Sequence, residues 1–235
     1  MERELFGVGF GKNILVGDNV PPQSKPSLLF LHGAGEANRK RFDKLRSLFL
    51  ERDIASCAFD FVGYGETGGN LPMSTLEDRT KQVLAIIDSG RVSQPLSIIA
   101  ASMGGYTAIK LTEFLKIYNL VFLAPAVYDR DAYSLKFGGG FTGAIQKPRS
   151  WLNSDAWGLL AKYSGNLLLV AAEKDTVVPR EIVHKIYNSA SHAASRQIFV
   201  VKDATHPLGK WLDEHPEDLQ IVFKKSFELI GRNLA

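Results

Sequence analysis

The sequence has very little cysteine and no long apolar run. Cys57 is the only cysteine among 235 residues, which excludes an internal disulfide and suits a reducing compartment. It lies in the apolar run ASCAFDF, where a small buried hydrophobe is its simplest role. No apolar run approaches the roughly 20 residues of a membrane span. The N-terminal MERELFGVGFGKN lacks the basic start and apolar core of a signal peptide. We therefore expect a cytoplasmic protein.

Net charge and metal-binding patterns are scarce as well. The formal charge is +3, which is too small to indicate nucleic acid or a membrane surface as a partner. The densest basic run, NRKRFDKLR at 38–46, carries Phe42 and Leu45 at helical spacing with Phe49. This pattern predicts an amphipathic helix whose basic residues face water. Clustered Cys/His spacing and a phosphate-binding loop are both missing, so we expect no metal site and no cofactor.

Short apolar runs alternate with segments of helical periodicity along the chain. Residues 5–16 have the pattern of an opening hairpin. The apolar run 96–101 precedes a helical pattern at 103–115, and similar pairs recur up to a last helix at 216–230. Ser74 in STLE is the expected first residue of a capping box. This alternation predicts an α/β fold with a mostly parallel sheet of about eight strands, covered by helices on both faces.

Residues 128–165 interrupt this alternation. They hold no clean strand but three consecutive glycines at 138–140 and a cluster of large rings. An excursion of this length in a compact α/β domain is typical of a lid or binding loop. We expect a cap insertion within a single domain that spans residues 1–235. The expected substrate-binding rings are Tyr128, Tyr133, Phe137, Phe141, Trp151 and Trp157. The equal alternative is that these rings form a small core of their own.

Three residues suited to hydrolytic chemistry each follow an apolar run. Ser102 follows SIIAA, Asp175 follows LLLVAAEK, and His206 follows IFVVKDAT. The carboxyl ends of parallel strands share one edge, where ligands bind, so we expect these side chains to meet. A histidine base can take the serine proton while a carboxylate holds the imidazole tautomer. The plain alternative for Ser102 is a helix cap. Asp129 and Glu173 are the alternatives to Asp175, with Asp129 the stronger of the two.

These motifs resemble the α/β-hydrolase superfamily over nearly the whole chain. AASMG around Ser102 is similar to the nucleophile elbow G-x-S-x-G, with Ala100 in place of the first glycine. EKDTVVP is similar to the family's acid loop. The resemblance implies a catalytic triad of Ser102, Asp175 and His206.

The HGAG loop adds an oxyanion hole to this resemblance. Backbone N–H groups of Ala34, in HGAG, and Met103, directly after the serine, would hold the oxyanion. His32 resembles the family's loop histidine, which supports this loop rather than taking part in the chemistry.

Compact size and a single insertion resemble the branch of monoglyceride lipases, feruloyl esterases and S33 aminopeptidases. This resemblance implies a serine hydrolase that cleaves carboxylic esters of small molecules through an acyl-serine intermediate. Thioester, amide or peptide cleavage uses the same groups, and a non-catalytic binding module on the same fold is a weaker alternative. The sequence leaves the natural substrate and the oligomeric state open.

Overall fold

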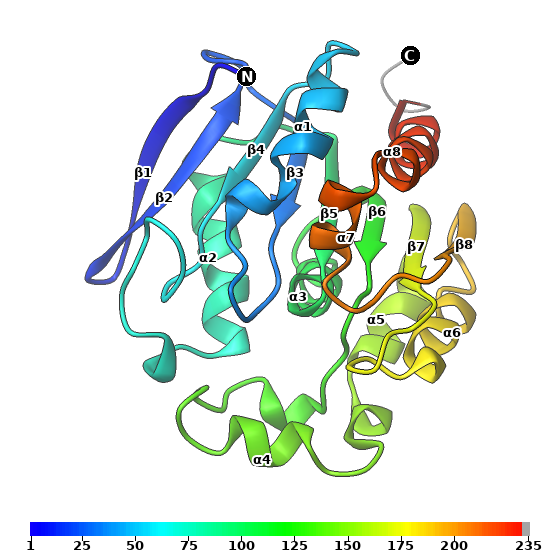
Figure 1. The fold of residues 1–235 in the computed structure, drawn as a ribbon. Helices are drawn as coiled ribbons and strands as arrows, with labels where there is room; N and C mark the ends of the chain where they lie inside the picture. Colours follow the sequence, from blue (N-terminus) through cyan, green and yellow to red (C-terminus); the bar gives the residue numbers. More distant parts are fainter. Residues whose placement is uncertain (232–235) are drawn as a thin grey trace.

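An eight-stranded sheet forms the centre of the computed structural model, which describes residues 1–231 (Figure 1). The strands are β1 (Glu4–Phe10), β2 (Asn13–Val20), β3 (Leu28–Leu31), β4 (Ser56–Phe59), β5 (Leu96–Ala101), β6 (Ile117–Leu123), β7 (Asn166–Ala172) and β8 (Ser195–Val201). Their order in the sheet is β1-β2-β4-β3-β5-β6-β7-β8. The hairpin of β1 and β2 joins β4 in antiparallel pairing. The remaining neighbours in the sheet, β4, β3, β5, β6, β7 and β8, all run parallel to one another. The α/β-hydrolase fold predicted from the sequence is therefore confirmed.

Helices cover both faces of this sheet. They are α1 (Asp43–Leu50), α2 (Leu76–Asp88), α3 (Met103–Leu111), α4 (Phe141–Ile145), α5 (Ala156–Lys162), α6 (Arg180–Ser189), α7 (Leu208–Glu214) and α8 (Pro216–Gly231). Helices α1, α7 and α8 pack on one face, and α2, α3, α5 and α6 pack on the other (Figure 1). Among the described residues, no helix combines the length and apolar character needed to cross a membrane.

The alternation of side chains in the strands explains why both faces are apolar. In β3, Leu28 and Phe30 join the core beneath α1 and α8, whereas Leu29 and Leu31 join the core beneath α2 and α3. Successive side chains of a strand point to opposite faces, so a strand covered on both sides must be apolar throughout. Exposed polar groups gather in the loops at the strand ends, and the candidate site forms among the loops at the carboxyl ends of the parallel strands.

Two local predictions for the helices are wrong by a few residues. Thr75, not Ser74, caps α2: its side chain accepts the N–H of Asp78, whose carboxylate accepts the N–H of Thr75. Both residues have an acid three positions later, so the sequence pattern could not separate them. Helix α3 ends at Leu111 rather than at residue 115, and Phe114 is exposed.

The prediction for the basic run 38–46 is confirmed for Phe42, Leu45 and Phe49, which are buried, and for Lys40 and Lys44, which are exposed, but it is wrong for two arginines. Arg39, in the short 3-10 helix η1 (Arg39–Phe42), and Arg46, in α1, are both buried. Arg39 forms ion pairs with Asp18 at 2.8 Å and with Asp60, and Arg46 pairs with Asp18 at 2.5 Å. These carboxylates come from β2 and from the end of β4. A local pattern does not show that distant carboxylates will provide partners for buried cations.

The segment 128–165 runs between β6 and β7. It contains the 3-10 helices η3 (Arg130–Ala132) and η4 (Ser150–Asn153) together with α4 and α5, and no strand of the sheet. Figure 1 shows α4 beyond the carboxyl ends of the parallel strands, whereas α5 lies beside α3 and α6. The segment therefore leaves the sheet at the edge where the candidate site lies.

Candidate active site

Ser102 occupies the sharp turn between β5 and α3. Its backbone has φ 47° and ψ −117°, a conformation that residues other than glycine rarely adopt. The side chain makes no capping hydrogen bond to the helix, although Ser102 holds the N-cap position. Its Oγ instead lies 2.9 Å from Nε2 of His206. The helix-cap interpretation of this side chain is therefore wrong.

Two glycines allow the HGAG loop to lie directly against this turn. A Cβ at Gly104 would be 2.5 Å from the carbonyl oxygen of Leu31, and one at Gly33 would be 3.0 Å from Cβ of Ser102. Because only glycine lacks this atom, the loop and the turn can approach through their backbones. The Gly33–Ala34 peptide is thereby brought next to the serine.

His206 follows β8 and links Ser102 to Asp175. Its Nδ1 lies 2.9 Å from Oδ2 of Asp175, whose Oδ1 accepts the N–H groups of Val177 and Val178, both at 2.9 Å. Burial raises the pKa of Asp175, but the hydrogen bonds from His206 and from the two backbone N–H groups outweigh it. The net pKa of the carboxyl lies below its usual value. An ionised carboxylate only accepts hydrogen bonds, so Nδ1 carries the imidazole proton and Nε2 is available to accept the serine hydroxyl proton.

The two alternative acids lie in other hydrogen-bond networks. Asp129 accepts the N–H of Asp131 and the side-chain amide of Asn153 at 3.1 Å. Glu173 accepts the backbone N–H of Asp203. The structure thus brings Asp175, and neither of its two alternatives, to the histidine.

The two backbone donors expected to form the oxyanion hole, Ala34 and Met103, face no acceptor within residues 1–231. Met103 is the first residue of α3, so its N–H has no acceptor within the helix. Ala34 lies exposed in the HGAG loop, and its N–H also makes no hydrogen bond within the described chain. Both donors are therefore available to an incoming oxygen atom.

His32 is a neutral part of the scaffold behind this loop. Its Nε2 lies 3.2 Å from the backbone N of Phe61, whose N–H must donate, so Nδ1 carries the proton and donates to the carbonyl of Gly33 at 2.8 Å. Burial, together with the nearby charge of Arg79, lowers the pKa of His32 to about 3. The imidazole is uncharged at neutral pH and both of its nitrogens are taken up by backbone partners, which agrees with the supporting role expected for it.

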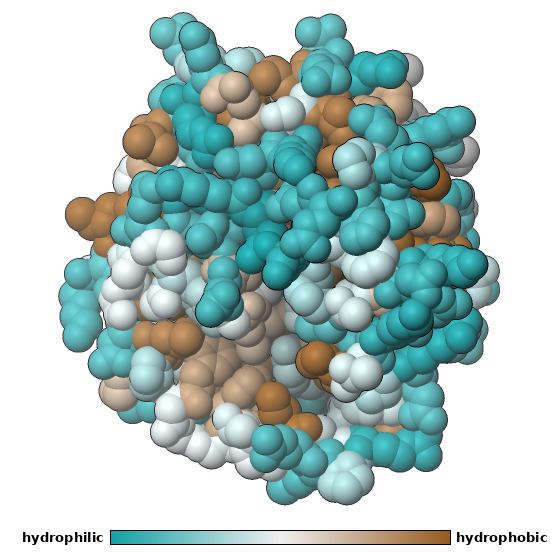
Figure 2. All heavy atoms as spheres, viewed as in Figure 1, coloured by the Kyte–Doolittle hydropathy of each residue, from teal (hydrophilic) through white to brown (hydrophobic). Residues whose placement is uncertain are grey.

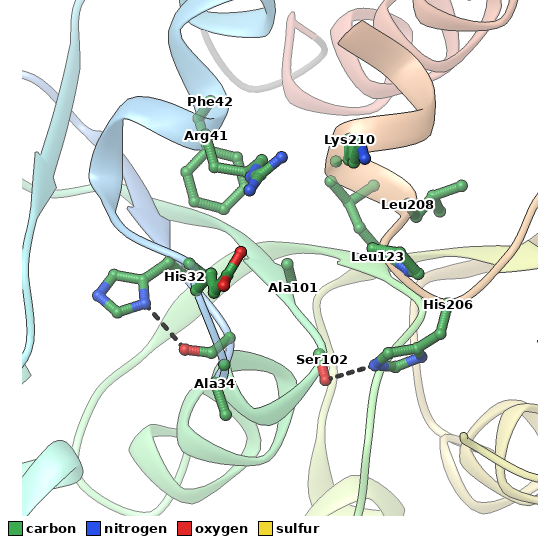
Figure 3. A pocket seen from close by; sticks show the side chains of 16 residues that line it. His32, Ala34, Arg41, Phe42, Ala101, Ser102, Leu123, His206, Leu208 and Lys210 are labelled. Atoms are coloured by element: carbon green, nitrogen blue, oxygen red, sulfur yellow. Dashed lines mark hydrogen bonds between the residues drawn. The ribbon is translucent and has the colours of Figure 1, made fainter. Parts of the chain in front are cut away.

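A cavity of about 400 Å³ opens over Ser102 (Figure 3). Ser102 and His206 lie at one end, and Arg41, Phe42 and Lys210 lie at the other, from η1 and α7. The lining is His32, Gly33, Ala34, Gly35, Glu36, Ala37, Arg41, Phe42, Ala101, Ser102, Leu123, His206, Pro207, Leu208, Gly209 and Lys210. The sequence does not indicate the far wall, because η1 and α7 are distant in the chain and meet only after folding.

The six rings predicted to bind substrate do not line this cavity. Those rings, Tyr128, Tyr133, Phe137, Phe141, Trp151 and Trp157, instead pack in pairs on one another and on Tyr106 of α3. Phe141 and Trp151 are buried in the main core, and the indole N–H of Trp157 donates to the carbonyl of Trp151. The rings therefore join the core on the α2 and α3 face rather than forming a separate one, and their part in substrate binding stays a prediction.

Arg79 is a further residue at the site that the sequence motifs do not identify. It is buried in α2, and its guanidinium donates to the carbonyl oxygens of His32 and Gly33. A signal was present: Arg79 lies three residues after Leu76 and four before Val83, on the apolar stripe of the helix. A cation on such a stripe has to find partners inside the protein.

Comparison with solved structures places this fold among known hydrolases. Est1E from Butyrivibrio proteoclasticus, with ferulic acid bound, is 19% identical with a TM-score of 0.73, over 96% of this chain and 99% of that chain. Serine hydrolase CCSP0084 from Cycloclasticus zankles is 16% identical with a TM-score of 0.72, over 95% and 98%. Esterase Pf2001 from Pyrococcus furiosus is 19% identical with a TM-score of 0.68, over 96% and 93%. At these identities the likeness concerns the fold.

Sequence comparison gives the family. No curated protein sequence matches the chain. The family model for serine aminopeptidase, S33, matches residues 22–151, which is more than half of the chain and includes the HGAG loop and Ser102. The chain therefore belongs to the serine aminopeptidase S33 family of α/β-hydrolases.

Proposed function

We propose that this protein is a serine hydrolase that cleaves carboxylic esters of small molecules through an acyl-serine intermediate. The observation that carries the proposal is the continuous chain of two 2.9 Å hydrogen bonds from Ser102 through His206 to Asp175. The side chains of His206 and Asp175 are only 16% and 10% exposed, so bulk water competes little for these contacts. A serine hydroxyl becomes an effective nucleophile when a base held in this way takes its proton.

The geometry supports a two-step reaction. Nε2 of His206 takes the hydroxyl proton as Oγ of Ser102 attacks the ester carbonyl carbon, and the N–H groups of Ala34 and Met103 hold the oxyanion that forms. The carbon–oxygen bond to the alcohol then breaks, the alcohol leaves with that proton, and the acyl group stays on the serine. Water then gives its proton to His206 and its oxygen to the acyl carbon, the bond between that carbon and Oγ of Ser102 breaks, and His206 returns the proton to Oγ. The acid departs, and the serine hydroxyl is restored.

Ester cleavage is favoured over removal of an N-terminal amino acid by the charges of the cavity. An aminopeptidase must bind the substrate's ammonium group, which carboxylates hold best. Here the far wall carries the cations Arg41 and Lys210, and Glu36 is the single carboxylate of the lining. Among the structures similar in fold, the ferulic acid complex of Est1E and the esterase Pf2001 agree with the ester proposal.

We also propose that residues 128–165 act as a cap within a single domain spanning the chain. What supports this is the place of α4 beyond the strand ends (Figure 1) and the apolar hollow that Figure 2 shows between this segment and the upper, charged part of the molecule. The rings of this segment pack on one another and on the main core, which anchors the cap to the body of the fold.

Covalent labelling with a fluorophosphonate tests the proposal. The wild-type protein should lose esterase activity as the label reaches one equivalent, and mass spectrometry should find it on the peptide that holds Ser102. Ser102→Ala should take up no label and lose activity toward aryl esters. Ser97→Ala, a serine inside β5 and away from the cavity, is the control and should still be labelled. Full turnover by Ser102→Ala would refute the proposal, and faster cleavage of matched amides than of esters would refute its substrate class.

A further inference from the structure

Arg79 is a buried cation without a buried carboxylate partner. It is 1% exposed, and no ion pair joins it to an acid within residues 1–231. Its guanidinium carbon lies 3.6 Å from the ring centre of Phe61, and its Nε is buried without a hydrogen bond in the described structure. Arg39 and Arg46, by contrast, are buried arginines that each form an ion pair with a buried carboxylate. Because burial of an unneutralised charge costs free energy, the contacts that Arg79 does make need an explanation.

The side-chain hydrogen bonds of Arg79 all go to the backbone of the HGAG loop. Nη2 donates to the carbonyl oxygen of His32, and Nη1 lies 3.4 Å from the carbonyl oxygen of Gly33. The carbonyl of Gly33 and the N–H of Ala34 belong to one trans peptide, in which the two groups point in opposite directions. Any contact that fixes the carbonyl of Gly33 therefore fixes the direction of the Ala34 N–H.

We propose that Arg79 is a positioning residue for the oxyanion hole: it holds the His32 and Gly33 carbonyls from behind, so that the Ala34 N–H is directed at the substrate carbonyl beside Ser102. The ring of His32 supplies a second donor to the Gly33 carbonyl at 2.8 Å. The contact of Arg79 with Phe61 fixes the plane of the guanidinium. This inference rests on the proposed hydrolase function and assigns Arg79 no contact with the substrate itself.

Two neighbouring peptides are held at once, and this is why arginine suits the position. A guanidinium presents several donors in one rigid plane, whereas a lysine ammonium is a point charge on a flexible stem. Lysine at position 79 would keep the charge but would not hold both carbonyls in one geometry. The charge and the geometry can therefore be separated by experiment.

The test compares an aryl ester with the matching thionoester, in which sulfur replaces the carbonyl oxygen. Sulfur accepts hydrogen bonds poorly, so the ratio of the two rates reports how well the oxyanion donors are aimed. This ratio is measured on one sample, and partial loss of folded protein cancels from it. For Arg79→Met we expect kcat for the ester to fall by about 10- to 100-fold. KM should change little, and the ratio of the ester rate to the thionoester rate should fall by about tenfold. Arg79→Lys should lie in between.

A matched control separates positioning from stability. Arg46→Met also removes a buried arginine, but one whose partners, Asp18 and Ser56, lie away from the serine. It should lower the melting temperature and leave the rate ratio unchanged. A wild-type rate ratio in both Arg79→Met and Arg79→Lys would overturn the inference. The proposed function would still stand in that case, because it depends on the labelling and activity of Ser102→Ala.

Discussion

At the scale of single residues, the hydrogen bonds of each carboxylate decide what it can do. Asp175 uses one oxygen on the backbone N–H groups of Val177 and Val178 and the other on His206. It is therefore fixed in direction as well as charged. Asp129 begins η3 and accepts the N–H of Asp131, which is a structural task. Both acids follow a strand of the sheet, so position alone does not separate them.

Asp175→Asn should therefore lower kcat by roughly a thousandfold or more, because an amide donor facing Nδ1 favours the wrong imidazole tautomer. The melting temperature should change only slightly, since the amide oxygen can still accept from Val177 and Val178. Asp129→Asn is the matched control and should keep kcat within about twofold of the wild-type value. Steady-state kinetics and thermal unfolding of both variants make the measurement. A crippled Asp129→Asn beside a mild Asp175→Asn would reverse the assignment.

At the scale of elements, the sequence predicts which residues follow the strands but not which segments form the walls of the cavity. Ser102, Asp175 and His206 could be predicted to meet because each follows an apolar strand and parallel strands end at one edge. The far wall of the cavity could not, because Arg41 and Lys210 are brought together by packing of η1 against α7. The rings of segment 128–165 do cluster, as the sequence predicts. Whether they face a pocket or one another depends on tertiary packing, which periodicity does not encode.

The junction of β3, β5 and α3 gives a prediction at the same scale. A methyl group at Gly104 would lie 2.5 Å from the Leu31 carbonyl oxygen and 2.9 Å from that of His32. Gly104→Ala should therefore destabilise the fold by about 1–3 kcal/mol. Its kcat should fall further than stability explains, because the displaced backbone leads into the HGAG loop. Gly158→Ala, in α5 with no atom within 4 Å of the new methyl, is the control.

Urea unfolding and ester kinetics on both glycine variants provide the check. Gly158→Ala should gain about 0.5–1 kcal/mol of stability, since alanine is the better helix former, and should keep its activity. If Gly104→Ala were as stable and active as the wild type, the close approach of the loop to the turn would be wrong.

At the scale of the whole molecule, buried polar side chains fasten the loops at the strand ends to the body of the fold. Arg39 ties Asp18 of β2 to Asp60 at the end of β4, and His32 ties the HGAG loop to the backbone of Phe61. Groups of this kind make stability depend on pH when their protonation differs between the folded and unfolded chain. His32 is the clearest case, because its pKa is lowered from 6.5 to about 3 by burial and by Arg79.

Between pH 6.5 and about 3 the unfolded chain binds a proton at residue 32 that the folded chain excludes. The free energy of unfolding must therefore fall as the pH is lowered through this window, by up to about 5 kcal/mol from this one group. Urea unfolding at a series of pH values measures the slope of the free energy of unfolding against pH.

His32→Asn keeps a donor for the Gly33 carbonyl but removes the imidazole, so its stability at neutral pH should be lower and its slope shallower. His192→Asn, which removes an exposed imidazole, is the control and should keep the wild-type slope. Protonation of carboxylates such as Asp175 lowers the free energy of unfolding at acid pH in all three proteins. The difference between their stability curves therefore isolates the contribution of residue 32. Parallel curves for the wild type and His32→Asn would mean that the folded protein accommodates a charged imidazole behind the HGAG loop.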